Sequence, residues 1–136
     1  MIMEADTIKD IDFIKLDTQG SELSILQGGE QRALKNIFGV QVEVEFIEMY
    51  KGQPLFKDID IFMVSNGFSI MDLRRNYWKR NCYYLYKGRG QLVFADALYF
   101  KKAENFFKGL SLAGDASFGR SKIYKSIMTC LLYGMF

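Results

Sequence analysis

The chain has 136 residues, of which 49% are hydrophobic and 25% are charged, and its formal net charge is +2. These values are typical of one globular domain, and 21 aromatic residues exclude a disordered chain. Histidine is absent, which excludes a Ser-His-Asp or Cys-His nucleophile, a histidine general base and imidazole-bound zinc. Cys82 and Cys130 form no CxxC motif, so we predict no metal site and a cytoplasmic location.

The chain begins with a predicted strand and two predicted helical pieces. Residues 11–17 form a short β-branched and aromatic run, which predicts a buried strand. Ser21 is a suitable N-cap for a helix that ends at Gly28-Gly29. Residues 30–36 add a second helical piece.

Three more predicted strands follow. Residues 40–46 alternate strictly between apolar and polar, and residues 55–66 carry apolar side chains at helical spacing. Residues 68–73 and 92–100 predict the third and fourth strands, with an irregular excursion over 74–90 between them. Because no helix separates these two strands, we expect them to pair antiparallel, whereas strand-helix alternation before them predicts a mainly parallel sheet.

The last part of the chain predicts a helical tail. It contains several glycines. Residues 121–132 place Ile123, Ile127 and Leu131 on one side of a helix. We expect this helix to dock on the domain or on a missing piece of it; binding to an anionic membrane surface is the alternative. No apolar run is long enough for a transmembrane span. We therefore divide the chain into an α/β unit, 1–103, and a tail, 104–136.

The junction after the first predicted strand is the first candidate site. Ligands of open α/β sheets bind beyond the carboxyl ends of the strands, where Asp17 is expected to lie. Gly20 permits a sharp turn, and Glu22 opens the next helix. In the alternative interpretation, Asp17 and Glu22 only satisfy backbone amides at the helix start.

A second candidate site follows the next strand. Glu43, Glu45 and Glu48 are three carboxylates that suit a hydroxyl-bearing or cationic ligand, and one of them suits a base of raised pKa. A polar strand face in water explains Glu43 and Glu45 almost as well.

The third candidate is the segment 74–89, which holds six basic and five aromatic residues, including Tyr77, Trp78 and Arg80. Basic side chains with stacking rings suit an anionic glycan or single-stranded nucleic acid. The alternative is a solvated loop whose rings pack back on the sheet. No RNA-binding consensus accompanies the segment, which argues against a nucleic-acid partner.

Several of these stretches together resemble the FkbM family of methyltransferases. The first motif is IDFIKLDTQGSE, residues 11–22, followed by Leu26 and Gly28. The later stretches that agree are Val42-Glu43-Val44-Glu45-Phe46, Tyr50, Asn66-Gly67-Phe68, Asp72-Leu73, Arg74-Arg75, Tyr77-Trp78-Lys79-Arg80, Gly90-Gln91-Leu92 and Ala95-Asp96-Ala97-Leu98-Tyr99. The similarity spans about residues 9 to 102.

The resemblance implies a partial Rossmann-like, class I methyltransferase sheet with strands in the order 4-5-7-6 and the seventh strand antiparallel. It implies S-adenosylmethionine as cofactor and methyl transfer to a hydroxyl of a sugar or another metabolite. It further implies the following roles: catalysis by Asp17 and Glu45, cofactor binding by Asp17, Gln19 and Gly20, and binding of a small-molecule or glycan acceptor by Glu22, Glu43, Tyr77, Trp78 and Arg80.

The family's glycine-rich cofactor turn precedes the part that this sequence resembles, and no such turn occurs in the 136 residues. We therefore expect a truncated or split methyltransferase that is inactive alone, completed by a missing N-terminal half or by a homo-oligomer. Two alternatives remain open: a non-catalytic binding module that uses residues 74–89, and an inactive remnant.

Overall fold

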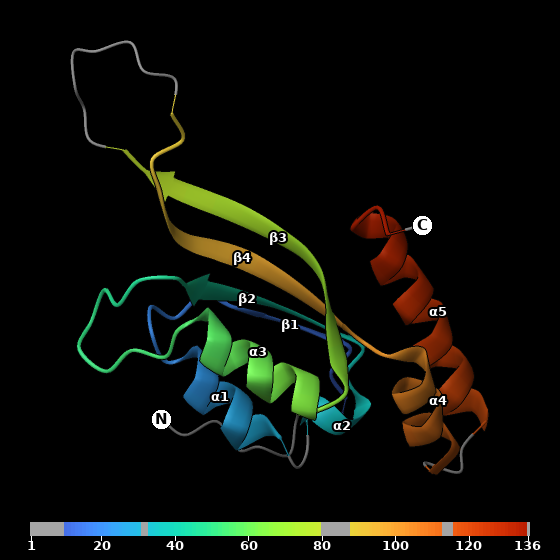
Figure 1. Cartoon of the computed structure of the whole chain (residues 1–136). Coiled ribbons are helices and arrows are strands. Elements are labelled where there is room, and N and C mark those ends of the chain that lie inside the picture. The colour runs from blue at the N-terminus through green and yellow to red at the C-terminus, as the bar shows by residue number, and fades with distance from the viewer. Residues whose placement is uncertain (1–9, 31–32, 80–87, 113–115, 136) are drawn as a thin grey trace, which may run out of the picture.

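The computed structural model describes residues 10–30, 33–79, 88–112 and 116–135 (Figure 1). Four strands and five helices form a mixed α/β fold in this part of the chain. The elements in chain order are β1 (Phe13–Leu16), α1 (Glu22–Gly29), α2 (Ala33–Asn36), β2 (Gly39–Glu45), α3 (Phe56–Ser65), β3 (Phe68–Trp78), β4 (Gln91–Lys101), α4 (Ala103–Leu112) and α5 (Ala116–Leu132).

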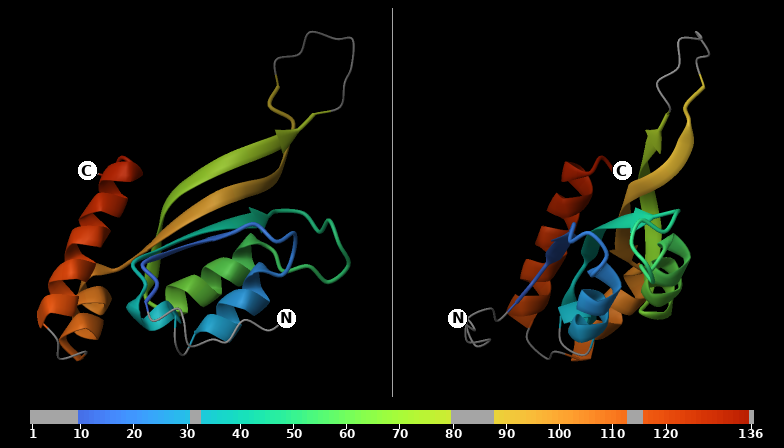
Figure 2. Two further views of the ribbon diagram at one scale, coloured as in Figure 1. Left: turned by 180° about the vertical axis from the view of Figure 1, so that it is seen from behind. Right: turned by 90° about the vertical axis from the view of Figure 1, so that its left-hand side faces the viewer.

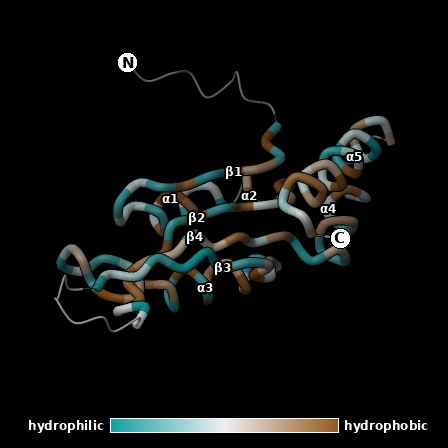
Figure 3. Tube along the Cα trace, turned by 90° about the horizontal axis from the view of Figure 1, so that it is seen from above, coloured by the Kyte–Doolittle hydropathy of each residue, from teal (hydrophilic) through white to brown (hydrophobic). Residues whose placement is uncertain are grey.

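The four strands form one sheet in the order β1-β2-β4-β3, which Figure 3 shows from above. β1 and β2 are parallel, whereas β4 runs antiparallel to both β2 and β3. This arrangement confirms the predicted 4-5-7-6 order with its antiparallel strand. It follows from the connections, because helices separate the parallel strands β1 and β2 in the chain, whereas no described helix separates β3 from β4.

The hydrophobic core lies between one face of the sheet and the helices α1 and α3, which lie side by side against it (Figure 1). Side chains alternate between the two faces of a strand, so the apolar residues of β2 all point to this core face. Val42 lies opposite Leu16 in β1 and Ala97 in β4, and the small Ala97 leaves room for the helices. The fully buried core residues include Leu26, Leu34, Ile37, Val40, Val42, Val44, Ile59, Met63, Phe68 and Tyr99.

β3 is longer than predicted, because Arg74–Trp78 continue the strand that the sequence pattern ends at Leu73. These residues carry no hydrophobic alternation of their own, but each pairs with β4, as Arg74 does with Asp96. The prediction of an irregular excursion is therefore wrong over 74–78. Hydrogen bonds to a well-defined neighbouring strand outweigh local pattern here.

Helix α4 was not predicted as a separate element, although a helical tail was. Gly109 lies inside it, which weakens the sequence signal, but the ring of Phe106 is buried and packs edge-on against Phe38. α5 contains the predicted helix 121–132 and begins earlier, at Ala116.

Helix α5 lies beside the start of β1 (Figure 2), and a buried lysine of the helix pairs with two aspartates that precede the strand. Lys122 is 2% exposed, forms ion pairs with Asp10 and Asp12, and donates a hydrogen bond to the Ile11 carbonyl at 3.0 Å. Lys125 reaches Asp12 at 2.7 Å from a half-exposed position. We call Lys122, Asp10 and Asp12 the helix clamp.

The residue after α5 covers the second face of the sheet, which points away from α1 and α3. The ring of Tyr133 stacks on Phe13 with a centroid distance of 5.3 Å, and its hydroxyl donates to Gln41 Oε1 at 2.8 Å. Both partners lie at the starts of their strands, so the carboxyl end of β2 on this face remains free of α5.

Helix α5 exposes several large hydrophobic side chains among polar ones. Hydrophobic residues recur along the helix in Figure 3, and Tyr124, Ile127, Met128 and Leu131 are 44–68% exposed. Two residues of the predicted apolar side, Ile127 and Leu131, are about half-exposed, whereas Lys122 on another side of the helix is buried. No described helix is long and apolar enough to cross a membrane.

Candidate functional site

The turn between β1 and α1 is held by Glu22. Its Oε1 accepts hydrogen bonds from the Thr18 backbone at 2.6 Å and the Thr18 hydroxyl at 2.9 Å, and its Oε2 accepts from the Gly20 N–H at 2.8 Å. Burial raises the pKa of Glu22. Hydrogen bonds from the backbone N–H groups of Glu22, Thr18 and Gly20 and from the Thr18 hydroxyl outweigh burial, so the pKa is lowered overall. Both carboxylate oxygens of Glu22 are thus committed to shaping the turn, and its predicted substrate role stays a prediction.

We expect Glu22→Gln to lower the free energy of unfolding at pH 7 by about 2–3 kcal/mol, because an amide cannot accept all these hydrogen bonds. A lowered carboxyl pKa contributes stability above the ordinary value of 4.5, and this contribution is lost as the pH falls. The deficit measured by urea unfolding should therefore shrink towards pH 3. Glu104→Gln, at an exposed position in α4, is the matched control. An equal loss in both variants would contradict the role of Glu22.

Gln53 joins this turn to the loop after β2. Its Oε1 accepts hydrogen bonds from the backbone N–H groups of Met49 at 3.1 Å and Tyr50 at 3.2 Å. The backbone of Gln19 has φ 59° and that of Gly20 has φ 111°, both left-handed. A Cβ on Gly20 would lie 3.2 Å from Gln53 Nε2, so glycine is needed here for its conformation and for the close approach.

Gly20→Ala is expected to destabilise the chain by about 1–3 kcal/mol, because alanine at this φ is strained and meets Gln53. Gly28→Ala is the matched control, since a Cβ there has open space inside α1 and should leave stability unchanged or raise it by about 0.5–1 kcal/mol. Thermal unfolding of both variants measures the difference. If Gly20→Ala were as stable as Gly28→Ala, the turn would not require glycine.

Glu43 lies close to this turn on the second face of the sheet. The Gln19 amide donates to Glu43 Oε2 at 3.5 Å, and Asp17 contacts the same carboxyl. Burial, followed by the charges of Asp17, Glu22 and Asp96, raises the pKa of Glu43. The structure therefore brings together the predicted site residues of two different strand ends.

Glu45 is the most strongly perturbed carboxyl at this site. It is 4% exposed, and its Oε2 has no hydrogen-bond partner. Burial raises its pKa to about 7, with further increases from the charges of Glu22 and Glu43. The Gln53 amide partly offsets this rise, although Gln53 Nε2 forms no hydrogen bond of standard geometry. A carboxyl of this kind can exchange a proton near neutral pH.

Glu43 and Glu45 open into a small pocket of about 120 Å³. Gln19 also lines it, and its remaining walls are Met49, Tyr50, Trp78 and Phe94. Pockets for whole drug-sized ligands have about 300–1,000 Å³. This pocket therefore admits only one group of a larger ligand, and we call it the Glu45 pocket.

The predicted site residues fall into three groups. Gln19, Glu43, Glu45 and Trp78 line the Glu45 pocket, whereas Asp17, Gly20 and Glu22 form the adjoining turn. Tyr77 is half-buried in β3 and does not line the pocket. Arg80 lies outside the described residues.

Sequence reasoning missed four contributors, namely Gln53, Met49, Tyr50 and Phe94. Phe94 lies opposite Glu45 in the β2–β4 register, so correct pairing of these strands would have indicated it. No sequence signal identified Gln53 and Met49, since a loop folding back brings them to the site, and Tyr50 entered only through the family resemblance.

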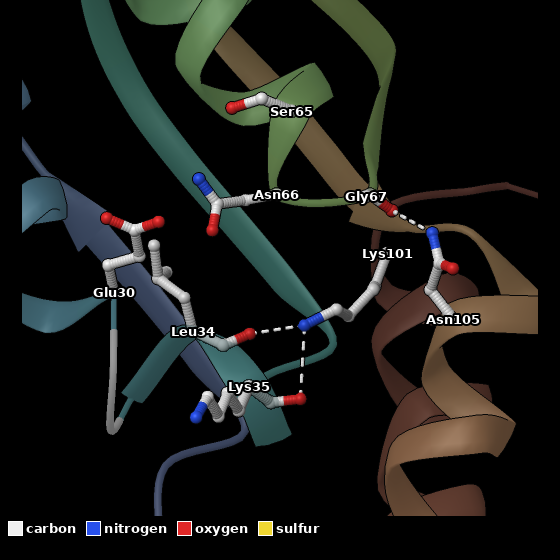
Figure 4. A pocket seen from close by; sticks show the side chains of 8 residues that line it. All are labelled: Glu30, Leu34, Lys35, Ser65, Asn66, Gly67, Lys101 and Asn105. Atoms are coloured by element: carbon white, nitrogen blue, oxygen red, sulfur yellow. Dashed lines mark hydrogen bonds between the residues drawn. The ribbon is translucent and has the colours of Figure 1, made fainter.

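A second pocket lies at the opposite end of the sheet, around Lys101 (Figure 4). The Lys101 ammonium donates to the carbonyls of Leu34 and Lys35, the latter at 3.0 Å, and stands 5.0 Å from the centre of the Phe68 ring. Burial lowers the pKa of Lys101. Lys101 therefore satisfies the carbonyl groups of α2, and we assign it a structural role.

Among the described residues, no group of three or more Asp, Glu, Cys or His side chains is arranged to hold a metal ion. The sheet order, the helices on one face and the acidic turn at the strand ends define a partial Rossmann-like fold with a site at its carboxyl edge.

The methyltransferase FkbM domain family model matches residues 1–70. This match covers more than half of the chain, so the protein belongs to the FkbM methyltransferase domain family. The matched residues include the turn after β1, Glu43 and Glu45, whereas Trp78 and Phe94 lie beyond them. Neither the curated proteins nor the solved structures contained a significant match.

Proposed function

We propose that this chain takes part in S-adenosylmethionine-dependent methyl transfer to a hydroxyl oxygen of a sugar or another metabolite. The observation that carries the proposal is Glu45, a buried carboxyl with a pKa of about 7 that lines a pocket at the strand ends. This residue lies within the part of the chain that matches a methyltransferase family.

The described residues fit one edge of the cofactor only. The exposed carboxylate of Asp17, the Gln19 amide and the tight backbone at Gly20 suit its hydrogen-bonding groups, whereas the Glu45 pocket is too small for the whole molecule. When bound, the cofactor supplies a methyl group on a reactive sulfonium. We propose that a second polypeptide or a second copy of this chain contributes the glycine-rich turn.

In this proposal, Glu45 orients the acceptor hydroxyl and takes its proton. As the acceptor oxygen gains the methyl group, its O–H bond breaks and the proton passes to the Glu45 carboxylate. Glu43 accepts a second hydrogen bond from the acceptor, and Trp78 packs against it. The remaining catalytic contribution is alignment of the reacting atoms.

Calorimetric titration of S-adenosylmethionine into the folded chain tests the cofactor role. We expect saturable binding that Asp17→Ala weakens at least tenfold, while Asp72→Ala, at an exposed position in β3, leaves it unchanged. A folded chain that binds no cofactor would contradict the proposal that its own residues form part of the cofactor site.

In the binding-module alternative, Trp78 would stack against nucleic acid or an anionic glycan. Its ring lies beside Glu43 and Glu45, and carboxylates repel the phosphates of nucleic acid and the acid groups of an anionic glycan. The structure therefore offers no observation that favours this alternative at Trp78.

A further inference from the structure

The Glu45 pocket combines a buried hydrogen-bond acceptor with a surplus of negative charge. Glu43 and Glu45 both line it, Glu45 is only 4% exposed, and the one side-chain donor that lowers the pKa of Glu45 is the neutral amide of Gln53. The charges that contribute most to the raised pKa values are carboxylates: Asp17, Glu22 and Asp96 act on Glu43, and Glu22 and Glu43 act on Glu45. A donor that also carries positive charge satisfies both conditions.

The walls of the pocket suit an organic cation. Tyr50 and Trp78 are 58% and 54% exposed at its rim, and Phe94 and Met49 complete the apolar lining. Aromatic rings attract ammonium groups through their negative faces, and they also pack against the C–H faces of a sugar ring. Hydrogen bonds from the Met49 and Tyr50 amides to Gln53 fix the loop that carries two of these walls.

We propose that the Glu45 pocket binds the ammonium group of the methyl acceptor, which is therefore an amino sugar or a related amino alcohol. This inference rests on the proposed function only where it identifies the ligand as the methyl acceptor. Binding of the ammonium group itself does not require the cofactor. The pocket of about 120 Å³ takes the ammonium group beside Glu43 and the neighbouring hydroxyl-bearing carbon beside Glu45, and the rest of the molecule lies against Trp78 at the rim.

Trp78 is the one tryptophan in the sequence, so its fluorescence reports on this pocket directly. The chain is titrated with glucosamine, with N-acetylglucosamine, which has the same ring without the charge, and with glucuronate. We expect saturable quenching by glucosamine, at least tenfold weaker binding of N-acetylglucosamine, and no binding of glucuronate. Raising the salt concentration should weaken glucosamine binding, because the attraction is electrostatic.

Two variants test whether the fluorescence quenching by glucosamine arises from binding in the Glu45 pocket. Glu45→Gln keeps the shape but removes the charge, and we expect it to bind glucosamine at least tenfold more weakly than the unaltered chain. Glu104→Gln, at an exposed position in α4, should bind it normally. Equal binding of glucosamine and N-acetylglucosamine, or a preference that survives Glu45→Gln, would overturn the inference.

Three further titrations separate this inference from its competitors. Quenching by S-adenosylmethionine that requires Glu45 and that glucosamine competes away would assign the pocket to the cofactor and overturn the inference. Glu45-dependent quenching by Mg²⁺ alone would assign it to a metal ion and overturn it as well. Methyl transfer to neutral sugars without glucosamine binding would refute this inference alone, whereas glucosamine binding by a folded chain that binds no cofactor would support the inference and contradict the cofactor role of Asp17, Gln19 and Gly20.

Discussion

Glu45→Gln is expected to stabilise the folded chain by about 2–3 kcal/mol at pH 8 while slowing methyl transfer about 100-fold or more. The folded protein holds the pKa of Glu45 near 7, compared with an ordinary value of 4.5, because the carboxylate is buried beside Glu22 and Glu43. A tenfold change in an acid dissociation constant corresponds to about 1.4 kcal/mol. Glutamine resembles the protonated carboxyl, so it avoids the cost of ionising this group in the folded state.

The sign of the pH effect follows from proton binding. Between pH 4.5 and about 7 the folded chain holds the Glu45 proton that the unfolded chain has released, so stability from this group falls as the pH rises. Urea unfolding from pH 4.5 to 8.5 should show this fall, and Glu45→Gln should lack it. Parallel pH curves for the two proteins would contradict a raised pKa at Glu45.

The rate effect has a separate cause. A positioned general base contributes about 10²–10⁴-fold to a reaction, and glutamine accepts no proton. In an assembled active enzyme, the rate should rise with pH through about 7 as Glu45 ionises, and Glu45→Gln should remove this dependence. Loss of activity together with loss of stability would indicate a structural role instead.

Lys122→Met is expected to lower the free energy of unfolding by about 3 kcal/mol. The substitution keeps the length of the side chain but removes the buried cation, which leaves Asp10 and Asp12 facing an apolar group. Removing one partner of a buried ion pair costs about 3–5 kcal/mol, and the two aspartates are 27–28% exposed, so we expect the lower end.

Lys125→Met is the matched control for the helix clamp. Lys125 is half-exposed and also pairs with Asp12, but an exposed ion pair contributes less than about 1 kcal/mol. Urea unfolding of both variants at low and high salt distinguishes them, because salt screens the exposed pair more. A loss at Lys125 equal to that at Lys122 would show that burial of the clamp contributes little.

The sequence patterns predicted most of the sheet correctly, because each pattern reports a local property that the fold preserves. Alternation over residues 40–46 predicted the strand β2, whereas the strand order with β2 and β4 at the centre came from the family resemblance and is observed. The extension of β3 over 74–78 was missed, since those residues become a strand only by pairing with β4. The register shift between Ile70 and Asp72 likewise depends on the partner strand.

In the candidate site, too, local patterns could be read from the sequence, whereas contacts between distant segments could not. Asp17, Glu43 and Glu45 could be placed together from sequence, because the ends of neighbouring parallel strands meet at one edge of a sheet. The role of Gln53 depends on a loop that folds back, and burial of Lys122 depends on a helix docking over a hundred residues later in the chain than its partners. No periodic pattern in the sequence indicates either contact.

The helix clamp also constrains the order in which this protein forms during synthesis. Lys122 lies 111 residues after Ile11, whose carbonyl it binds, so the start of β1 leaves the ribosome long before α5 exists. Until then Asp10 and Asp12 repel each other without a buried cation, and the ring of Phe13 lacks its cover from Tyr133. The earliest of the described strands is therefore held in part by the last described helix, and a nascent chain arrested before residue 122 should expose the start of β1 to proteases and chaperones.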